Sequence, residues 1–196
     1  NGGVLPPSEL AARPGKAETL QFAAIKANQQ GFVLDYETVV YNINEQHLVF
    51  KGDQTYYVPD GAYASMVTIE GGAVIKLGEI APGIQCHNVF CETDAYRPAF
   101  ITSKHDDSVG EWIPGSNGLS DFYYPDIGLW AQFERRIENL RIKHTWVALI
   151  LGSESQPGMI KDVQFIDCAW GVTSFGNNLT VQVDNCLFKD CKWIFG

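Results

Sequence analysis

The stretch Val163–Phe175 reads VQFIDCAWGVTSF, and the stretch Cys186–Gly196 reads CLFKDCKWIFG. Both contain the phrase Phe-x-Asp-Cys-x-Trp, and the second copy follows the first by 23 residues. The register extends back without a gap to a third copy, so that Ile142, Phe165 and Phe188 share one column. A fixed period of about 20–50 residues is typical of a solenoid or a repeat array. The sequence therefore predicts a stack of similar turns.

The local pattern inside each copy indicates strands. Leu140 and Ile142 are apolar at positions i and i+2, which is the period of a β-strand. The frame of leucine-rich repeats, Leu-x-x-Leu-x-Leu, is absent. We therefore predict a parallel β-solenoid whose turns stack about 4.8 Å apart. Asn139, Asp162 and Asn185 then form a polar ladder at a turn, where such side chains bond neighbouring backbone.

The segment Phe165–Val172, FIDCAWGV, resembles a coil of the right-handed parallel β-helix of pectate-lyase-like proteins. The N-terminal part is similar to these proteins too. Ala17–Gly31 has apolar residues at helical spacing and ends in a glycine, and strand patterns with the turn VPDGAY follow. Within this group, the likeness is to bacteriophage tailspikes. It covers roughly residues 17–100 and 137–196 and concerns architecture and coil style, without a catalytic signature.

The resemblance implies an all-β fold, a right-handed parallel β-helix with an N-terminal capping α-helix. We predict a linker over residues 1–16, the capping helix over 17–31, and the β-helix over 32–196 with a long loop excursion at about 103–130. The coils before residue 100 are expected to be irregular, because the 23-residue register is not visible there. The run that ends at Gly196 is strand-like, so we expect the natural chain to continue.

The resemblance also implies a function. A tailspike is a homotrimer of the virion tail, made in the cytoplasm of the host bacterium and joined to other tail proteins through its N-terminus. Its body would bind a bacterial surface polysaccharide, capsule or O-antigen, and the full-length protein would depolymerise it as an endoglycosidase or a lyase. Two alternatives remain: a structural or receptor-binding fibre segment without activity, and a bacterial pectate-lyase-like polysaccharide enzyme.

Two carboxylates are candidates for catalysis. Asp167 and Asp190 share a column on adjacent turns, where stacking would bring their carboxyl groups about 5 Å apart. That separation is close to the one in retaining glycosidases, which use such a pair as nucleophile and acid/base. The alternative is that both are turn residues that hydrogen-bond to backbone, in a column that begins with His144.

The excursion is the candidate contact surface. It carries five acidic and five aromatic residues without any period, and a long loop of this kind in a compact domain is usually functional. Aromatic rings cover the C–H faces of sugars, and carboxylates accept hydrogen bonds from hydroxyl groups. The alternative is that the aromatic residues only fold the loop onto the solenoid. The residues expected to contact glycan or a neighbouring subunit are Trp112, Phe122, Tyr123, Tyr124, Trp130, Glu111 and Asp121.

Composition narrows the partners. The net charge of −9 argues against nucleic-acid binding and against docking on anionic lipid. No apolar run approaches the roughly 20 residues of a membrane helix, so we predict no membrane insertion. No cofactor motif is present, and the pair Cys86 and Cys91 lacks the spacing and the second pair of a zinc site, so we predict no cofactor and no metal. The five cysteines are expected to be reduced.

Overall fold

The computed structural model describes residues 36–41, 45–118, 125–133, 136–152, 158–175 and 180–196. All of them belong to one compact unit, Asp35–Gly196. They form seventeen strands and no α-helix, so this part of the chain also contains no helix able to cross a membrane. The predicted linker (1–16) and capping helix (17–31) lie outside the described residues.

The strands form three parallel sheets, two of seven strands and one of three. Sheet A contains, in order along the stack, β1 (Tyr36–Thr38), β3 (Thr55–Val58), β5 (Val74–Leu77), β7 (Ala99–Ser103), β10 (Leu140–Lys143), β13 (Gln164–Ile166) and β16 (Leu187–Lys189). Sheet B contains β2 (His47–Phe50), β4 (Ala62–Glu70), β6 (Ile84–Glu92), β8 (Ile127–Ala131), β11 (Val147–Leu151), β14 (Trp170–Ser174) and β17 (Trp193–Phe195). Sheet C contains β9 (Arg136–Glu138), β12 (Gly158–Lys161) and β15 (Val181–Asp184).

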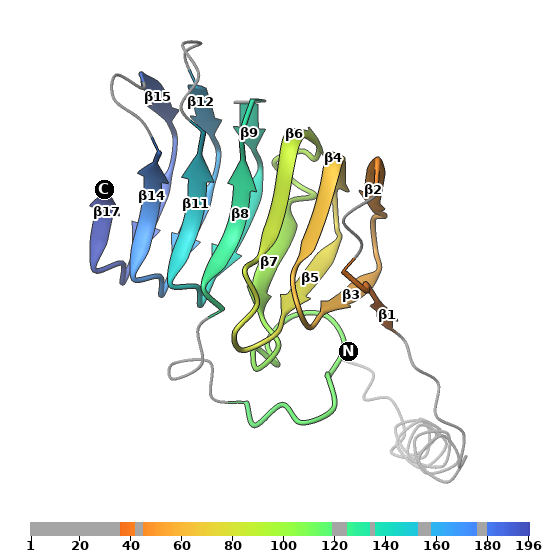
Figure 1. The fold of residues 1–196 in the computed structure, drawn as a ribbon. Helices are drawn as coiled ribbons and strands as arrows, with labels where there is room; N and C mark the ends of the chain where they lie inside the picture. Colours follow the sequence, from red (N-terminus) through yellow and green to blue (C-terminus); the bar gives the residue numbers. More distant parts are fainter. Residues whose placement is uncertain (1–35, 42–44, 119–124, 134–135, 153–157, 176–179) are drawn as a thin grey trace, which may run out of the picture. The chain divides into compact units, whose positions relative to one another are not determined.

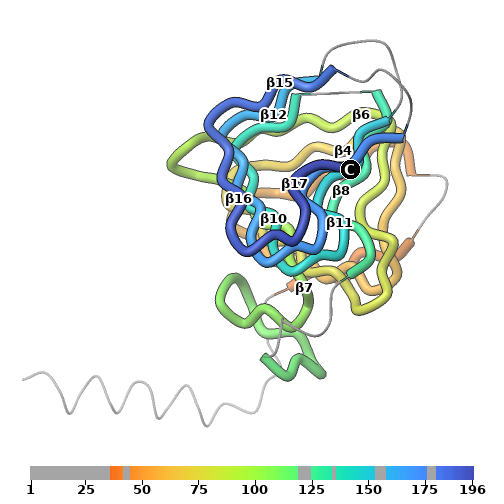
Figure 2. Tube along the Cα trace, turned by 90° about the vertical axis from the view of Figure 1, so that its left-hand side faces the viewer, coloured from red at the N-terminus to blue at the C-terminus, as the bar shows by residue number. Residues whose placement is uncertain are grey.

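The chain alternates between sheet A and sheet B as it winds, and each strand pairs in parallel with its counterpart one turn later (Figure 1). Figure 2 looks along the stack from the C-terminal end, where successive turns lie over one another. The predicted parallel β-solenoid is thus confirmed, with about six turns. The 23-residue register is the pairing of its C-terminal strands: Ile142 pairs with Phe165, and Phe165 with Phe188.

The core lies between the sheets and is built from stacked rows of like residues. Alternate residues of each strand point inward, and in sheet A the central inward row is almost completely buried. It consists of Tyr56, Ile75, Ile101, Ile142, Phe165 and Phe188. The rings of Phe165 and Phe188 stack with their centroids 4.8 Å apart. Parallel pairing of identical turns therefore brings like side chains into contact, and their burial stabilises the stack.

The first turns are more regular than predicted, but with a different period. Tyr36 pairs with Thr55 and Thr55 with Val74, each step being 19 residues, and the same step separates His47 from Met66. These turns consist of a strand in sheet A and a strand in sheet B. The last three turns add a short strand in sheet C, which lengthens each turn to 23 residues. Two different coil lengths therefore share one stack.

The excursion leaves the solenoid after β7 and returns at β8. Its N-terminal limit agrees with the predicted residue 103, but strand pairing resumes at Ile127 and not at about residue 130. Trp130 therefore belongs to a strand of sheet B, where it pairs with Ile150 of the next turn. In Figure 2 the described part of the excursion lies outside the cross-section of the stack.

Candidate functional site

The outer face of sheet A carries most of the polar features that strand alternation places on the surface of the solenoid. Register pairing aligns its outward residues into two rows. The first row runs Tyr36, Thr55, Val74, Phe100, Arg141, Gln164 and Leu187. The second begins Thr38, Tyr57, Lys76 and Thr102, and it continues on the C-terminal turns with Lys143, Ile166 and Lys189. The excursion covers one end of this face and leaves the other end open.

The covered end is packed by residues 104–118 of the excursion. The backbone N–H of Glu111 donates to Thr55 Oγ1 at 3.0 Å, and a Cβ on Gly110 would lie only 2.7 Å from Val74 Cγ1. Ile113 is completely buried. This part of the excursion therefore packs on β3 and β5 as an integral layer of the fold, in addition to any contact that it makes elsewhere.

Asp106 ties the excursion to two further strands of sheet A. Its Oδ2 accepts hydrogen bonds from Thr102 Oγ1 and from Lys143 Nζ, both at 2.8 Å, and its Oδ1 accepts one from the Ser108 backbone at 3.0 Å. Burial by itself would raise the pKa of this carboxyl group. The hydrogen bonds from its side-chain partners outweigh burial and hold the pKa at about 2. Asp106 is therefore a stable anion at neutral pH, which suits anchoring and does not suit a general acid.

Lys76 lies under the same part of the excursion. Its side chain is completely buried, and Nζ has no hydrogen-bond partner among the described residues. Burial lowers the pKa of this ammonium group, while the nearby carboxylates of Asp107, Asp106 and Glu111 oppose the shift. A buried ammonium group without a partner is costly, so Lys76 destabilises the covered end of the face.

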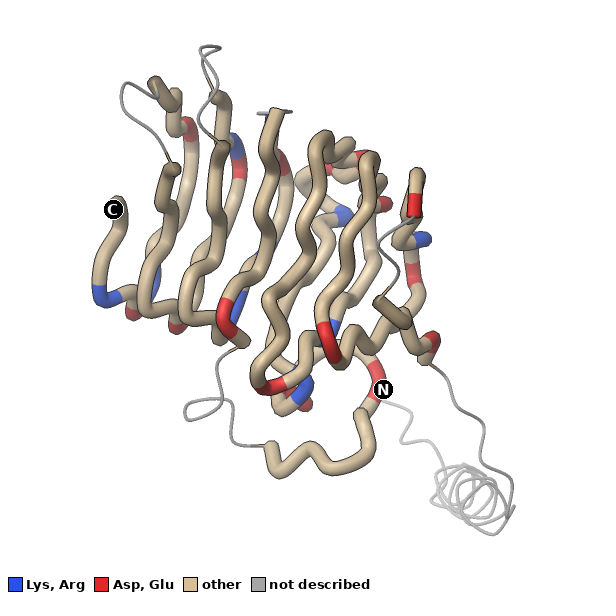
Figure 3. The backbone as a smooth tube through the Cα atoms, viewed as in Figure 1, with Lys and Arg blue, Asp and Glu red and all other residues tan. Residues whose placement is uncertain are grey.

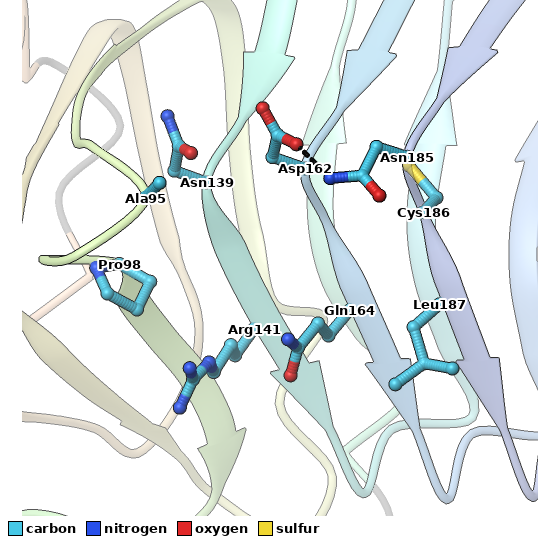
Figure 4. A pocket seen from close by; sticks show the side chains of 9 residues that line it. All are labelled: Ala95, Pro98, Asn139, Arg141, Asp162, Gln164, Asn185, Cys186 and Leu187. Carbon is cyan, nitrogen blue, oxygen red and sulfur yellow. Dashed lines mark hydrogen bonds between the residues drawn. The ribbon is translucent and has the colours of Figure 1, made fainter.

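The open end forms a groove of about 370 Å³, which we call the sheet A groove. Its lining residues are Ala95, Pro98, Asn139, Arg141, Asp162, Gln164, Asn185, Cys186 and Leu187. Figure 4 shows two parallel rows, with Arg141, Gln164 and Leu187 on successive strands of sheet A and the polar ladder beside them. The groove therefore crosses three consecutive turns and offers each turn's side chains at nearly the same position.

The polar ladder occupies the corner between sheets C and A. Asn139, Asp162 and Asn185 all have φ near +50° (52°, 54° and 48°), a region that asparagine and aspartate tolerate better than other residues with side chains. The predicted role of this column as a turn is thus confirmed. Asn185 Nδ2 donates to Asp162 Oδ1, and Asn139 Nδ2 donates to the carbonyl of Thr93 at 3.3 Å. The ladder consequently presents ordered amide and carboxylate groups along one side of the groove.

Asp167 and Asp190 occupy the other corner, between sheets A and B. Together with His144 they have φ of 53–55°, so each takes a left-handed turn position. Asp190 is paired with Lys189 at 3.2 Å and is mostly exposed, while Asp167 Oδ2 lies 3.9 Å from His144 Nδ1. These contacts agree with turn residues on the corner column. The candidate catalytic role of the pair stays a hypothesis.

The predicted contact residues are distributed over two faces. Trp112 is 55% exposed on the excursion, beside Glu111. Trp130 projects from sheet B, where its ring packs against Phe175 with centroids 5.4 Å apart. Because Trp130 belongs to β8, it is separate from the excursion surface. Phe122, Tyr123, Tyr124 and Asp121 lie outside the described residues.

Sequence analysis missed the sheet A groove, although a signal for it was present. In the 23-residue register, Arg141, Gln164 and Leu187 form a column between two apolar columns. A column of this kind faces outward, beside the ladder that was predicted. The pairing of Asp106 with Lys143 was not predictable in the same way, because it joins the aperiodic excursion to the strand β10.

The cysteines and the metal-binding side chains add no second site. All five cysteines are thiols, and Cys168 and Cys191 stack on neighbouring turns. Among the described residues, no group of three or more histidine, cysteine, aspartate or glutamate side chains is arranged to hold a metal ion.

Comparison with known proteins leaves the fold and the groove as the only basis for a class. No protein-family model matches the chain, and no curated protein and no solved structure is significantly similar to it. The described residues define a parallel β-solenoid with a polar groove across consecutive turns of one sheet.

Proposed function

We propose that this chain is part of the body of a bacteriophage tailspike, which binds a bacterial surface polysaccharide, and that the full-length protein depolymerises this polysaccharide. The observation that carries the proposal is the sheet A groove. It repeats a polar row on three turns that are spaced about 4.8 Å apart. A polysaccharide is a repeating ligand, so a repeating groove offers successive sugars similar partners.

The chemistry of the lining supports carbohydrate as the ligand class. Asn139, Gln164 and Asn185 carry amides that both donate and accept hydrogen bonds, as sugar hydroxyl groups require. The C-terminal part of the lining adds Leu187, an apolar surface for the C–H face of a sugar ring. The net charge of −9 disfavours nucleic acid as the alternative polymer.

The remaining features of the proposal come from the resemblance to tailspikes. They are a homotrimer, attachment to other virion tail proteins through the N-terminus, and location in the phage tail. The exposed Trp112 of the excursion supports a contact with glycan or with a neighbouring subunit. Hydrolysis and elimination are both compatible with the described side chains, because no catalytic pair is assembled in the sheet A groove.

Binding of the purified protein to capsule and O-antigen preparations tests the proposal. The variant Gln164→Ala removes one amide from the sheet A groove and should weaken binding about two- to tenfold. Gln182→Ala is the matched control, because Gln182 is an exposed glutamine on β15 outside the groove. Binding to none of the preparations, or equal loss in both variants, would contradict the proposal.

Incubation of the full-length protein with a bound polysaccharide separates an enzyme from a pure binder. Size-exclusion chromatography should show the polymer converted to oligosaccharides, with a new ultraviolet absorbance if the reaction is an elimination. Binding without any shortening of the polymer would leave the receptor-binding fibre as the correct reading and remove the enzymatic part of the proposal.

A further inference from the structure

The outer face of sheet A is positively charged in a protein that is acidic overall. The chain carries 23 acidic and 14 basic residues, yet the charged side chains in the two outward rows are all basic. They are Lys76, Arg141, Lys143 and Lys189. By contrast, the strands of sheet B carry no basic residue, and they are almost uncoloured in Figure 3. The cations are therefore concentrated on the face that contains the groove.

Three of these four cations are already committed within the fold. Lys143 binds Asp106 at 2.8 Å, Lys189 binds Asp190 at 3.2 Å, and Lys76 is buried under the excursion. Arg141 differs from them, because no carboxylate of a described residue pairs with its guanidinium group. It is also the only basic residue in the described lining of the sheet A groove.

Phe100 orients Arg141 in the groove. The guanidinium carbon lies 5.2 Å from the centroid of the Phe100 ring, on the neighbouring strand β7. Stacking on an aromatic face reduces the freedom of a long side chain without satisfying its N–H donors. Arg141 thus offers a preoriented fork of donors, and this fork matches the two oxygens of a carboxylate.

The acid in the lining does not neutralise this fork. Asp162 Oδ1 accepts a hydrogen bond from Asn185, and Oδ2 lies 3.9 Å from Lys161 Nζ. In Figure 4, Asp162 lies in the ladder row, with Arg141 in the other row beside Gln164. The carboxylate of Asp162 therefore has partners of its own on the opposite side of the groove.

From these observations we infer that the sheet A groove selects an anionic polysaccharide, one whose repeating unit carries a carboxylate, and that Arg141 binds that carboxylate. The inference rests on the proposed function and adds the class of substrate. The neighbouring amides of Gln164 and Asn139 bind hydroxyl groups of the same chain, so charge and hydroxyl pattern are recognised together. A neutral polysaccharide leaves the donors of Arg141 without a partner and binds more weakly.

The test uses wild-type protein and a panel of purified bacterial polysaccharides, some with uronate, sialate or pyruvate carboxylates and some neutral. Each acidic polysaccharide that binds is also tested after its carboxyl groups have been chemically reduced to alcohols. We expect binding to acidic members, and we expect their reduced forms to bind about tenfold or more weakly. Affinity for the acidic members should also fall as the salt concentration rises.

Three variants locate the effect. Arg141→Gln should weaken binding of an acidic polysaccharide about tenfold or more and abolish the difference between its native and reduced forms. Arg141→Lys retains the charge without the fork and should fall between wild type and Arg141→Gln. Lys192→Gln removes the same charge from an exposed residue outside the groove lining and should bind as wild type does.

The outcomes separate the two levels of the argument. Equal binding of native and reduced forms, or binding of neutral members alone, overturns the anionic selectivity and leaves the proposed function intact. Binding of no member of the panel overturns both. Equal losses in Arg141→Gln and Lys192→Gln would assign the effect to overall charge and overturn the role of Arg141. Circular dichroism of each variant checks folding, and the reduced polysaccharides keep the test decisive if Arg141→Gln fails to fold.

Discussion

Phe165 shows, at the scale of a single residue, how the repeat stabilises the stack. Its side chain is completely buried, and its ring stacks on Phe188 of the next turn. Phe165→Ala should cost ~3–5 kcal/mol of unfolding free energy, since it removes buried surface and leaves a cavity. Lys161→Ala, at a side chain that is 44% exposed, should cost little. Urea unfolding measures both, and equal shifts of the midpoint would contradict the assigned faces.

Asp106 is the residue that most directly connects the excursion to sheet A. Asp106→Asn removes the charge that Lys143 and Thr102 hydrogen-bond to, and should destabilise the protein at pH 7 by about 1.5–3 kcal/mol. The pKa of Asp106 is about 2 in the folded protein and has a usual value of 3.8. Its contribution is therefore fully present above pH 3.8 and is lost as the pH falls toward 2.

The pH dependence provides the check on Asp106. The difference in unfolding free energy between wild type and Asp106→Asn should be constant between pH 5 and pH 7 and shrink below pH 4. Asp107→Asn, on the neighbouring exposed residue, is the control and should show a smaller difference. A difference for Asp106→Asn that does not change with acidification would show that the carboxylate gains nothing from its partners.

The cysteines should differ strongly in reactivity. A hydrogen bond from Cys168 lowers the pKa of Cys191, whereas burial raises the pKa of Cys86 to about 12. Because the thiolate is the reactive form, iodoacetamide should label Cys191 of the native protein well before Cys86. Mass spectrometry of the labelled peptides measures the order. After unfolding without reductant, all five cysteines should be labelled, and fewer would reveal a disulfide.

At the scale of elements, the excursion is partly a packing layer. Gly110 has φ of +61° and lies against Thr55 and Val74, whereas Gly115 has φ of +82° with nothing near its Cβ position. Gly115→Ala should cost about 1–2 kcal/mol, from backbone strain alone. Gly110→Ala should cost a further 1–3 kcal/mol, roughly, from overpacking. Thermal or urea unfolding compares the two, and equal costs would show that the excursion does not press on sheet A.

At the scale of the whole molecule, the proposed trimer is the simplest property to measure. One chain has a mass of 21.7 kDa. Several large apolar side chains are about half exposed, among them Trp112, Trp146 and Phe175, and association would remove such surface from water. Sedimentation equilibrium should give three times the chain mass for the assembled protein. A mass of one chain across the concentration range would contradict the trimer and favour a monomeric enzyme.

The repeat could be read from sequence because stacking is a local rule applied many times. Each turn must place an apolar residue on the same inward row, so Ile142, Phe165 and Phe188 recur at a constant step. The 19-residue step of the first turns was written in the same way, in Phe50 and Ile69, but it was overlooked because only one period was sought. Coil length changes when a strand of sheet C is inserted, and no single period describes both parts.

The amino-acid sequence by itself thus determined the fold class, the inward rows and the turn ladders, since these follow from strand alternation and from the side chains that tolerate left-handed corners. Tertiary structure alone decided where the excursion lies and what it covers. Its contacts, such as that of Asp106 with Lys143, join segments without a common period. The sheet A groove exists because the excursion covers one end of the outer face and leaves Arg141 and its row open at the other.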